Sequence, residues 1–224
     1  MHLTILGATG RIGSLALNYA LAAGHTITTL SRSGTGSIPA DERLIVVKGD
    51  IADATAMRQA VEGSEAVVAA LGPRSNTLEA ELALEIGMRN LVAAMTGAGV
   101  SRLVALSGAA VDAPGDAKPV IDRVVSRFVR VAARHVVGAK QREFAVFTAS
   151  DLEWTALRPP LVTDGEARGY HLSEHLRPGA RVTRADVAAA LIDQLADRGF
   201  VRAAPFVLPG SRVVGAKGFE PSTS

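Results

Sequence analysis

The sequence predicts an α/β fold, with a doubly wound parallel sheet in a single domain. Two observations carry this prediction. Short apolar runs alternate along the chain with longer segments in which apolar residues recur at helical spacing. The runs are apolar throughout, which is typical of strands that helices cover on both faces of a sheet. Because crossovers between parallel strands are right-handed, such strands and helices wind into a doubly wound sheet.

In the first half of the chain, glycines mark the ends of the predicted elements. The apolar runs predict strands at residues 3–6, 26–30, 44–47 and 66–71. The helical spacing of apolar residues predicts helices at residues 12–23, 54–61 and 78–97. Gly7 ends the first strand, Gly24 is suited to cap the first helix, and Gly63 is suited to end the second.

The second half of the chain continues this alternation. Strands are expected at residues 103–106 and 154–157, and an edge strand at 206–208. A long helical stretch at 120–149 is expected to bend or break near Gly138. A last helix is expected at 183–195, with Thr183 as N-cap and Asp186 close to the position of a capping box. Residues 211–224 show little periodicity, and we expect a disordered or non-native tail there, outside the domain at 1–210.

Length and composition exclude several classes of protein. A chain of 224 residues that is 48% hydrophobic can bury one large core, so disorder throughout is excluded. The absence of cysteine excludes disulfides, thiolate zinc sites, iron–sulfur clusters and a cysteine nucleophile. A net charge of +2 and an aromatic content of 4% argue against a nucleic-acid partner. Without an export signal or a membrane-spanning stretch, we expect a cytoplasmic protein that acts on a small molecule, as a monomer or small homo-oligomer.

A glycine motif follows the first predicted strand. Residues 7–13 read GATGRIG. Gly7 allows the tight turn out of the strand, Gly10 lets the backbone approach a pyrophosphate, and Gly13 lets the next helix pack closely. The amides at the start of that helix then face the phosphates, where the helix dipole also favours negative charge. An ordinary glycine-rich turn is the alternative, but the position between a strand and an amphipathic helix favours dinucleotide binding.

The end of the second strand indicates which dinucleotide is bound. NAD sites usually carry Asp or Glu there, which binds the ribose hydroxyls. In this sequence the strand ends in Ser31, Arg32 and Ser33, and no acid occurs before Asp41. The Arg32 guanidinium can bind a 2′-phosphate, with a serine hydroxyl beside it. We therefore expect NADPH, with a solvated surface arginine as the alternative interpretation of Arg32.

Five segments in this order resemble a known family. They are GATGRIG at 7–13, GDI at 49–51, ALGPR at 70–74, ALSGAAV at 105–111 and WTALRPPLVTDG at 154–165. They are similar to segments of the atypical short-chain dehydrogenases/reductases, in the NAD(P)H-binding, NmrA-like group that includes biliverdin-IXβ reductase/flavin reductase. The resemblance covers residues 1 to about 197. It implies a Rossmann-like NAD(P)-binding fold.

The resemblance also implies a set of cofactor-binding residues. The pyrophosphate loop would comprise Gly7, Thr9, Gly10, Arg11 and Ile12. Arg32 would meet the adenosine 2′-phosphate, while Asp50 and Ile51 would flank the adenine. The segment that passes the nicotinamide ribose and the phosphates would comprise Leu71, Gly72 and Arg74. For Asp50, an acid at a helix N-terminus is the alternative interpretation.

One departure from the family concerns acid–base chemistry. Most short-chain dehydrogenases use a Tyr-x-x-x-Lys pair. Here Lys140 stands in the expected helix, but Val136 occupies the tyrosine position, and Tyr19 and Tyr170 have no such spacing to a lysine. The usual machinery for reducing a ketone is therefore absent. Hydride transfer to an acceptor that takes its proton from solvent is compatible with this sequence.

We therefore expect an NADPH-dependent reductase of a small planar acceptor: a flavin, a quinone or a tetrapyrrole. Lys140 and Ser107 are the candidate catalytic residues, with a solvated helix lysine and a loop-capping serine as the alternatives. The acceptor would lie in a pocket formed by the loop after Leu106, the helix with Lys140, and Pro159 with Pro160. A non-catalytic NmrA-like NADP(H)-sensing protein is the second hypothesis. A sugar-nucleotide epimerase-like enzyme is the third, and the missing tyrosine disfavours it.

The remaining candidates have structural interpretations that we favour. His135 is a candidate acid, although histidines at surfaces and helix ends are commoner. His171 and His175 are spaced to share a helix face, but they lack a third ligand, so no metal site is expected. Trp154 is expected in the core. A solvated helix face, a partner surface or the mouth of an anionic substrate site would account for the regular spacing of Arg123, Arg127, Arg130 and Arg134.

Overall fold

A computed structural model describes residues 1–35, 38–113, 116, 134–177 and 179–210 of the chain. Residues 120–133 of the helix expected at 120–149 lie outside the described residues, and with them Arg123, Arg127 and Arg130. The tail expected at 211–224 also lies outside them. Within the described part, no helix is both long enough and apolar enough to cross a membrane.

Six strands form one parallel sheet, which confirms the predicted fold class. The strands are β1 (His2–Leu6), β2 (Thr26–Ser31), β3 (Leu44–Lys48), β4 (Ala66–Ala69), β5 (Arg102–Leu106) and β6 (Glu153–Leu157). Their order in the sheet is β3-β2-β1-β4-β5-β6, and every neighbouring pair is parallel. The winding reverses between β1 and β4, so a crevice is expected at the carboxyl ends of these two strands.

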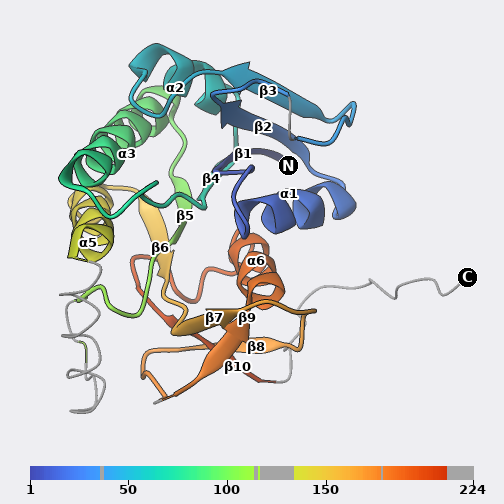
Figure 1. Cartoon of the computed structure of the whole chain (residues 1–224). Helices are drawn as coiled ribbons and strands as arrows, with labels where there is room; N and C mark the ends of the chain where they lie inside the picture. Colours follow the sequence, from blue (N-terminus) through green and yellow to red (C-terminus); the bar gives the residue numbers. More distant parts are fainter. Residues whose placement is uncertain (36–37, 114–115, 117–133, 178, 211–224) are drawn as a thin grey trace, which may run out of the picture.

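Helices cover both faces of this sheet (Figure 1). On one face lie α2 (Ala54–Val61), α3 (Leu78–Ala98) and α5 (Arg134–Thr148). On the other lie α1 (Gly13–Ala22) and α6 (Arg184–Asp193). The inner strands β1, β4 and β5 are therefore largely buried from both sides, whereas the edge strand β3 is only partly covered and exposes Ile45.

Side chains fix where three of the helices begin. Asp53 caps α2 and Thr77 caps α3, each by accepting hydrogen bonds from amides of the first turn. Thr183 and Asp186 form the expected capping box at the start of α6. In contrast, α1 begins after Ile12 with no side-chain cap.

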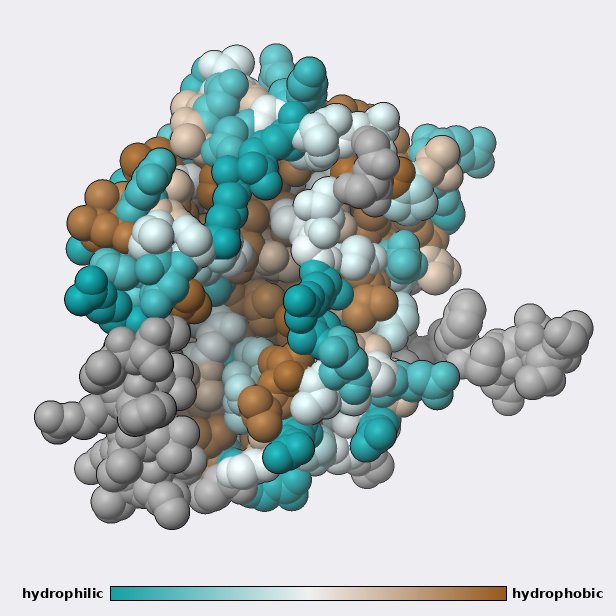
Figure 2. Space-filling model, in the orientation of Figure 1, coloured by the Kyte–Doolittle hydropathy of each residue, from teal (hydrophilic) through white to brown (hydrophobic). Residues whose placement is uncertain are grey.

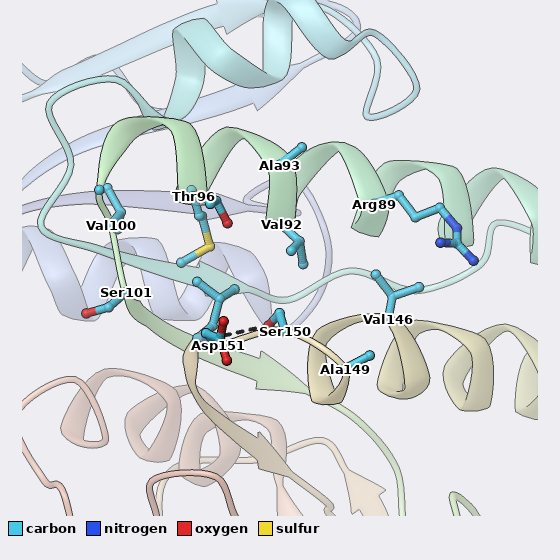
Figure 3. A pocket seen from close by; sticks show the side chains of 13 residues that line it. Arg89, Val92, Ala93, Thr96, Val100, Ser101, Val146, Ala149, Ser150 and Asp151 are labelled. Carbon is cyan, nitrogen blue, oxygen red and sulfur yellow. Dashed lines mark hydrogen bonds between the residues drawn. The ribbon is translucent and has the colours of Figure 1, made fainter.

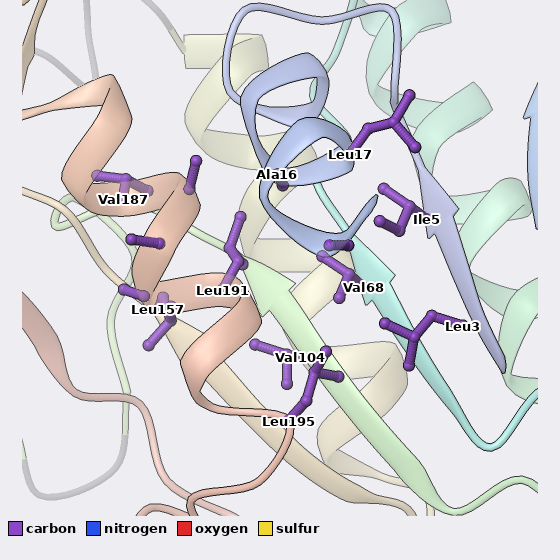
Figure 4. Packing of buried hydrophobic residues seen from close by; sticks show 14 of the residues in the cluster. Leu3, Ile5, Ala16, Leu17, Val68, Val104, Leu157, Val187, Leu191 and Leu195 are labelled. Carbon is purple, nitrogen blue, oxygen red and sulfur yellow. The ribbon is translucent and has the colours of Figure 1, made fainter. Parts of the chain in front are cut away.

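An apolar core fills the space between the sheet and the pair of helices α1 and α6. Leu17 of α1 and Leu191 of α6 pack in one cluster with Ile5, Val68 and Val104 of the sheet (Figure 4). All five side chains are almost completely buried. This core holds the start of α1 at a fixed height above the carboxyl ends of the strands.

An aromatic cluster in the opposite core joins α5 to β6. The ring of Trp154 lies 5.7 Å from that of Phe144 and 5.5 Å from that of Phe147, measured between centroids. Trp154 is buried, which confirms its expected place in the core. These contacts hold the C-terminal half of α5 against the edge of the sheet.

Four short strands beside α6 form two small sheets, and three of these strands were not predicted (Figure 1). The strands β7 (Leu161–Thr163) and β9 (Arg181–Thr183) pair in parallel, and β8 (Tyr170–Ser173) pairs antiparallel with β10 (Phe206–Pro209). The edge strand expected at 206–208 is confirmed as β10, which belongs to the small sheet with β8, and Phe206 also forms an isolated parallel bridge with Arg158, just beyond β6. Strands of three or four residues are too short to show a periodicity.

The expected break at Gly138 is wrong, because α5 runs through this residue. A Cβ on Gly138 would lie 2.7 Å from Oε1 and 3.0 Å from Oε2 of Glu81. The glycine lets the Glu81 carboxylate of α3 approach the backbone of α5. Close packing of α3 against α5 accounts for a glycine at this position.

Candidate functional site

The residues that the sequence singles out come together at the carboxyl edge of the sheet. Residues 7–12 follow β1, Arg32 follows β2, Asp50 follows β3, residues 71–74 follow β4, and Ser107 follows β5. Open α/β sheets bind ligands at this edge, where the winding reverses. Figure 2 shows a hollow near the middle of the face seen, at the place where the chain after β1 meets the chain after β4 in Figure 1.

The glycine turn after β1 is packed tightly. Gly7 has a φ of +80°, and a Cβ there would lie 2.4 Å from the carbonyl oxygen of Ala70. A Cβ on Gly13 would lie 2.0 Å from the carbonyl oxygen of Gly7, so the start of α1 touches the turn. Gly10 is exposed, and its Cβ would lie 3.2 Å from that same oxygen. The fold therefore needs glycine at positions 7 and 13, whereas Gly10 is constrained much less.

Backbone donors at the start of α1 have no partner. The helix lacks a side-chain cap and has no acid in its first turn. The Gly10 N–H is used inside the turn, where it donates to the carbonyl of Gly7 at 2.9 Å. The amides of Arg11, Ile12 and Gly13 have no hydrogen-bond partner among the described residues. Such a group of amides at a helix N-terminus is suited to bind an anion.

Charged side chains gather beyond β2, β3 and β4. Arg74 Nη2 donates to Asp50 Oδ2 at 2.7 Å, and the Ala52 N–H donates to Asp50 Oδ1 at 3.0 Å. The hydrogen bond from Ala52, followed by the Arg74 side chain and the charge of Arg32, lowers the pKa of Asp50. Arg32 is exposed and makes no hydrogen bond with the described residues, so its guanidinium is available to a ligand. The cap of α2 is Asp53, which rules out that role for Asp50.

Two residues of α3 hold the chain after β3, and the sequence did not indicate them. Asn90 Nδ2 donates to the carbonyl oxygens of Ile51 and Ala52, both at 3.0 Å. Gly87 leaves room for Ile51, because a Cβ there would lie 2.6 Å from Ile51 Cδ1. The spacing of three residues between Gly87 and Asn90 places them on one helix face. That spacing was the only signal in the sequence, and it does not name Ile51 as the partner.

The chain segments after β4 and β5 carry polar groups without partners. Gly72 is exposed, and its N–H has no hydrogen-bond partner among the described residues. Ser107 is 8% exposed, and its Oγ is buried with no partner in the described segments, although its N–H donates to the carbonyl of Leu157 at 2.8 Å. A buried hydroxyl without a partner costs free energy that a ligand can recover. The Ala109 N–H donates to the carbonyl of Pro159 at 3.2 Å, so the loop after β5 lies against Pro159.

Lys140 lies inside the molecule. Its Nζ donates to the carbonyl oxygens of Leu71 and Leu106 and to Oε2 of Glu143, each at 2.6 Å. The Lys140 side chain is 11% exposed and the Glu143 side chain 2%. Burial raises the pKa of Glu143, while the nearby Lys140 opposes that shift. The interpretation of Lys140 as a solvated helix lysine is therefore wrong.

His135 joins α5 to α3. Its Nδ1 lies 2.9 Å from Oε2 of Glu81, and Arg142 Nε donates to Oε1 of the same carboxylate at 2.7 Å. The hydrogen bonds from His135 and then Arg142 lower the pKa of Glu81. The His135 N–H also donates to Asn76 Oδ1 at 3.0 Å. These contacts give His135 a structural role between two helices.

The other histidine prediction is corrected. His171 lies in β8 and His175 in the bend that follows, so they do not share a helix face. The described residues contain no group of three or more His, Asp or Glu side chains arranged to hold a metal ion. Tyr170 donates its hydroxyl to Asp193 Oδ2, which links β8 to α6.

A cavity of about 620 Å³ lies at the opposite edge of the sheet (Figure 3). It is lined by the C-terminal ends of α3 and α5 and by the residues that lead into β5 and β6, among them Val92, Thr96, Ser150 and Asp151. This is the amino-terminal end of the strands. The cavity is therefore separate from the glycine turn and from the groups around it.

Comparison with known proteins gives the family. A family described as NAD(P)H-binding matches residues 7–198. A short-chain dehydrogenase/reductase from Veillonella parvula DSM 2008 is 23% identical, with 98% of this chain and 99% of that chain covered and a TM-score of 0.76. A second Veillonella parvula structure, in complex with NADP, is 24% identical, with 97% and 99% covered and a TM-score of 0.73. ChuY, an anaerobillin reductase from Escherichia coli O157:H7, is 18% identical, with 93% and 97% covered and a TM-score of 0.73.

The solved structures share the fold, and the family match spans most of the chain. Two of these neighbours are described as short-chain dehydrogenases/reductases, the wider group of the atypical, NmrA-like proteins that the sequence segments resemble. The site fits a nicotinamide dinucleotide, since unpartnered amides face the place of the pyrophosphate and a free arginine follows β2. The chain belongs to the NAD(P)H-binding family, with a Rossmann fold and a nicotinamide dinucleotide as its cofactor.

Proposed function

We propose that this protein is an NADPH-dependent reductase that transfers hydride to a small planar acceptor, such as a flavin, a quinone or a tetrapyrrole. The observation that carries the proposal is the uncapped start of α1 at the carboxyl edge. Three amides there lack a partner, and the first turn contains no acid that would compete with a phosphate. A dinucleotide pyrophosphate satisfies these donors.

Arg32 supports a preference for NADPH over NADH. It follows β2 directly, is exposed, and is not engaged by any described side chain. The charge of Arg32 acts on Asp50, but Asp50 is paired with Arg74. A guanidinium binds phosphate through charge-assisted hydrogen bonds, so the 2′-phosphate of NADPH is the matching ligand. Of the two flanking serines, Ser33 is exposed and Ser31 is buried, so Ser33 is the one that assists.

The chain's own residues bind and orient the dinucleotide. The turn at 7–12 holds the pyrophosphate, and the Gly72 N–H donates to a ribose or phosphate oxygen. Asp50 and Ile51 flank the adenine. The Ser107 hydroxyl, buried without a partner, donates to the ligand near the nicotinamide. When bound, the dinucleotide supplies the hydride.

A planar acceptor fits the lack of a protein acid. Val136 stands one helical turn before Lys140, where most short-chain dehydrogenases have tyrosine. Reduction of a ketone needs a proton donor at the carbonyl oxygen. A flavin, a quinone or a tetrapyrrole can take its proton from water, so this site suits such an acceptor. ChuY, one of the structural neighbours, is described as an anaerobillin reductase.

The missing acid also supports a second candidate, an NADP(H)-sensing protein without turnover. Such a protein needs the same binding groups and no proton donor. The two candidates therefore differ only in whether an acceptor is reduced.

The test follows the oxidation of NADPH by the purified chain with a flavin, a quinone and a bilin. NADH and the Gly10→Val variant serve as controls. A reductase gives acceptor-dependent oxidation that is faster with NADPH than with NADH and strongly reduced in Gly10→Val at the same NADPH concentration. Binding of NADPH without oxidation on any acceptor would favour the sensor, and the absence of dinucleotide binding would refute both.

A further inference from the structure

We propose that Lys140 is a positioning residue that ties the end of β4 to the end of β5, and that Glu143 holds it in this place. We call the contacts of Lys140 Nζ with Leu71, Leu106 and Glu143 the Lys140 bridge. The bridge fixes two ligand-facing groups, the Gly72 N–H and the Ser107 hydroxyl. It rests on the proposed function, because these groups are the ones proposed to meet the dinucleotide and the acceptor.

All the donors of Lys140 are in use. An ammonium group has three N–H bonds and no acceptor. Its three partners here are the carbonyl oxygens of Leu71 and Leu106 and Oε2 of Glu143, each at 2.6 Å. Lys140 therefore has no donor left for a ribose hydroxyl. If it gave up a proton, two N–H donors would remain for three acceptors, and the buried carboxylate would lose its cation.

The bridge lies just beyond the point where β4 and β5 separate. Their parallel pairing ends at Ala69 and Ala105. Leu71 lies two residues past the end of β4, and Leu106 is the last residue of β5. Beyond the end of this pairing, no hydrogen bond between the strands joins the segments that carry the Leu71 and Leu106 carbonyls. The ammonium group supplies the cross-link that backbone pairing no longer provides.

The geometry of the peptide bond carries this constraint to the ligand side. In a trans peptide the C=O and N–H point in opposite directions. When Lys140 holds the carbonyl of Leu71, the N–H of Gly72 is directed away from the bridge. That N–H has no partner among the described residues, and a Cβ on Gly72 would meet nothing within 4 Å. Lys140 thus sets the direction of an open backbone donor.

The same reasoning applies at the end of β5. The Leu106 carbonyl points to Lys140, while the N–H of Ser107 donates to the carbonyl of Leu157 at 2.8 Å. The peptide between Leu106 and Ser107 is therefore fixed on both sides. The Cα of Ser107 follows directly, so the place of its unpartnered hydroxyl is fixed with it.

Glu143 keeps Lys140 at the bridge. It stands three residues after Lys140 on α5 and is 1% exposed. Its Oε2 accepts from Lys140, and its Oε1 has no hydrogen-bond partner within the part of the chain that the structure describes. A buried carboxylate without a cation is very costly. If Lys140 turned toward a ligand, the buried Glu143 carboxylate would lose its cation.

The experiment compares Lys140→Met and Glu143→Leu with wild type and with the control Arg142→Met. Arg142 is exposed on the same helix and pairs with Glu81 and Glu85, so its loss removes a cation from α5 without touching the bridge. Three quantities are measured. They are the hydrogen exchange of residues 69–72 and 105–108 without ligand, the Kd of NADPH without acceptor, and the pH dependence of kcat.

A positioning role predicts faster exchange at both segments in Lys140→Met and a loss of NADPH affinity of about tenfold, the equivalent of one hydrogen bond. Glu143→Leu shifts both readouts in the same direction, by less. The pH dependence of the remaining kcat stays that of wild type. Arg142→Met leaves both segments and the Kd near wild type.

The proposal would be overturned if Lys140→Met kept wild-type hydrogen exchange and wild-type NADPH affinity but lost kcat and changed its pH profile. That result would show that Lys140 is a proton donor. Equal changes in Arg142→Met would overturn it as well, because they would reflect a general loosening of α5. Wild-type behaviour of Glu143→Leu would remove the part assigned to Glu143. If the wild-type chain bound no NADPH, the proposed function would fail, and the exchange measurement alone would still decide whether the bridge exists.

Discussion

Two glycines of the same turn, Gly13 and Gly10, should respond very differently to an added side chain. A Cβ on Gly13 would lie 2.0 Å from the carbonyl oxygen of Gly7, 2.7 Å from its carbonyl carbon and 3.2 Å from the amide nitrogen of Ala8. These are all backbone atoms. Gly7 cannot move away from Gly13, because its Cα packs against the carbonyl of Ala70. A Cβ on Gly7 would lie 2.4 Å from that carbonyl oxygen. Gly13→Ala must therefore distort the turn, the start of α1 or both.

The size of each effect follows from these contacts. Overpacking of this kind costs about 1–3 kcal/mol. For a chain of this length, each kcal/mol lowers Tm by about 2–4 °C. A Cβ on Gly10 would meet only the Gly7 carbonyl oxygen, at 3.2 Å, so Gly10→Ala should change stability by less than about 0.5 kcal/mol. The branched side chain of Gly10→Val should occupy the place of the pyrophosphate. The loss of one or more charge-assisted hydrogen bonds then weakens NADPH binding by about 10- to 150-fold.

Thermal unfolding followed by circular dichroism gives the stability, and titration with NADPH gives the affinity. We expect Gly13→Ala to melt well below wild type. Gly10→Val should melt close to wild type but bind NADPH poorly. A wild-type Tm for Gly13→Ala would refute the packing argument. Retained NADPH affinity in a folded Gly10→Val protein would show that Gly10 has no place in the site.

Three further predictions concern stability. Gly138→Ala should lower Tm, because its Cβ would lie 2.7 Å from Glu81 Oε1. The control Gly97→Ala has open space around it and should raise stability by about 0.5–1 kcal/mol. Equal changes in Tm for the two variants, followed by circular dichroism, would contradict this prediction. The pKa of Glu81 is lowered in the folded state, so its contribution to stability is present above the usual value of 4.5 and is lost as pH falls through the lowered pKa. Glu81→Gln should make the acid limb of Tm against pH shallower, and an unchanged limb would show that the carboxylate is not involved. Thr183→Ala should cost about 1 kcal/mol in denaturant unfolding by removing the cap of α6, and no loss would mean that the capping box adds nothing.

The sequence predicted the sheet and most helices because their signals are local. The helix at 54–61 has the bounds that its apolar spacing indicated, and Thr183 caps α6 through the residue three positions later. The glycine motif was equally readable, since strand, turn and helix are adjacent in the chain. Local signals suffice where the partners of a residue lie within a few positions of it.

Contacts between distant residues could not be read in this way. Gly138 looked like a break because the sequence does not show that a carboxylate from α3 packs against it. The spacing of Lys140 and Glu143 suggests an ion pair, but two of the Lys140 partners are carbonyls 69 and 34 residues away. The burial that gives Glu143 its role appears only when α5 packs on the sheet. The short strands β7, β8 and β9 were missed for a related reason, since their pairing partners define them.

The same limit applies to Asn90. Its side-chain amide holds the chain after β3 through the Ile51 carbonyl, which is 39 residues away in the sequence. The residues around Asn90 in the sequence do not indicate this partner. The residues proposed to contact the dinucleotide were thus easier to place at the carboxyl edge than the residues that hold the loops there.

The central claim is that this carboxyl edge binds NADPH through the start of α1 and Arg32. The most direct measurement is the Kd of NADPH and of NADH for wild type, Arg32→Ala and Arg11→Ala, all at one salt concentration because phosphate contacts are screened. A charge-assisted hydrogen bond to the 2′-phosphate predicts that Arg32→Ala weakens NADPH binding by about 10- to 150-fold and leaves NADH binding nearly unchanged. Arg11→Ala, in the pyrophosphate turn, should weaken both dinucleotides alike. Equal losses for both dinucleotides in Arg32→Ala, or no loss for either, would contradict the claim.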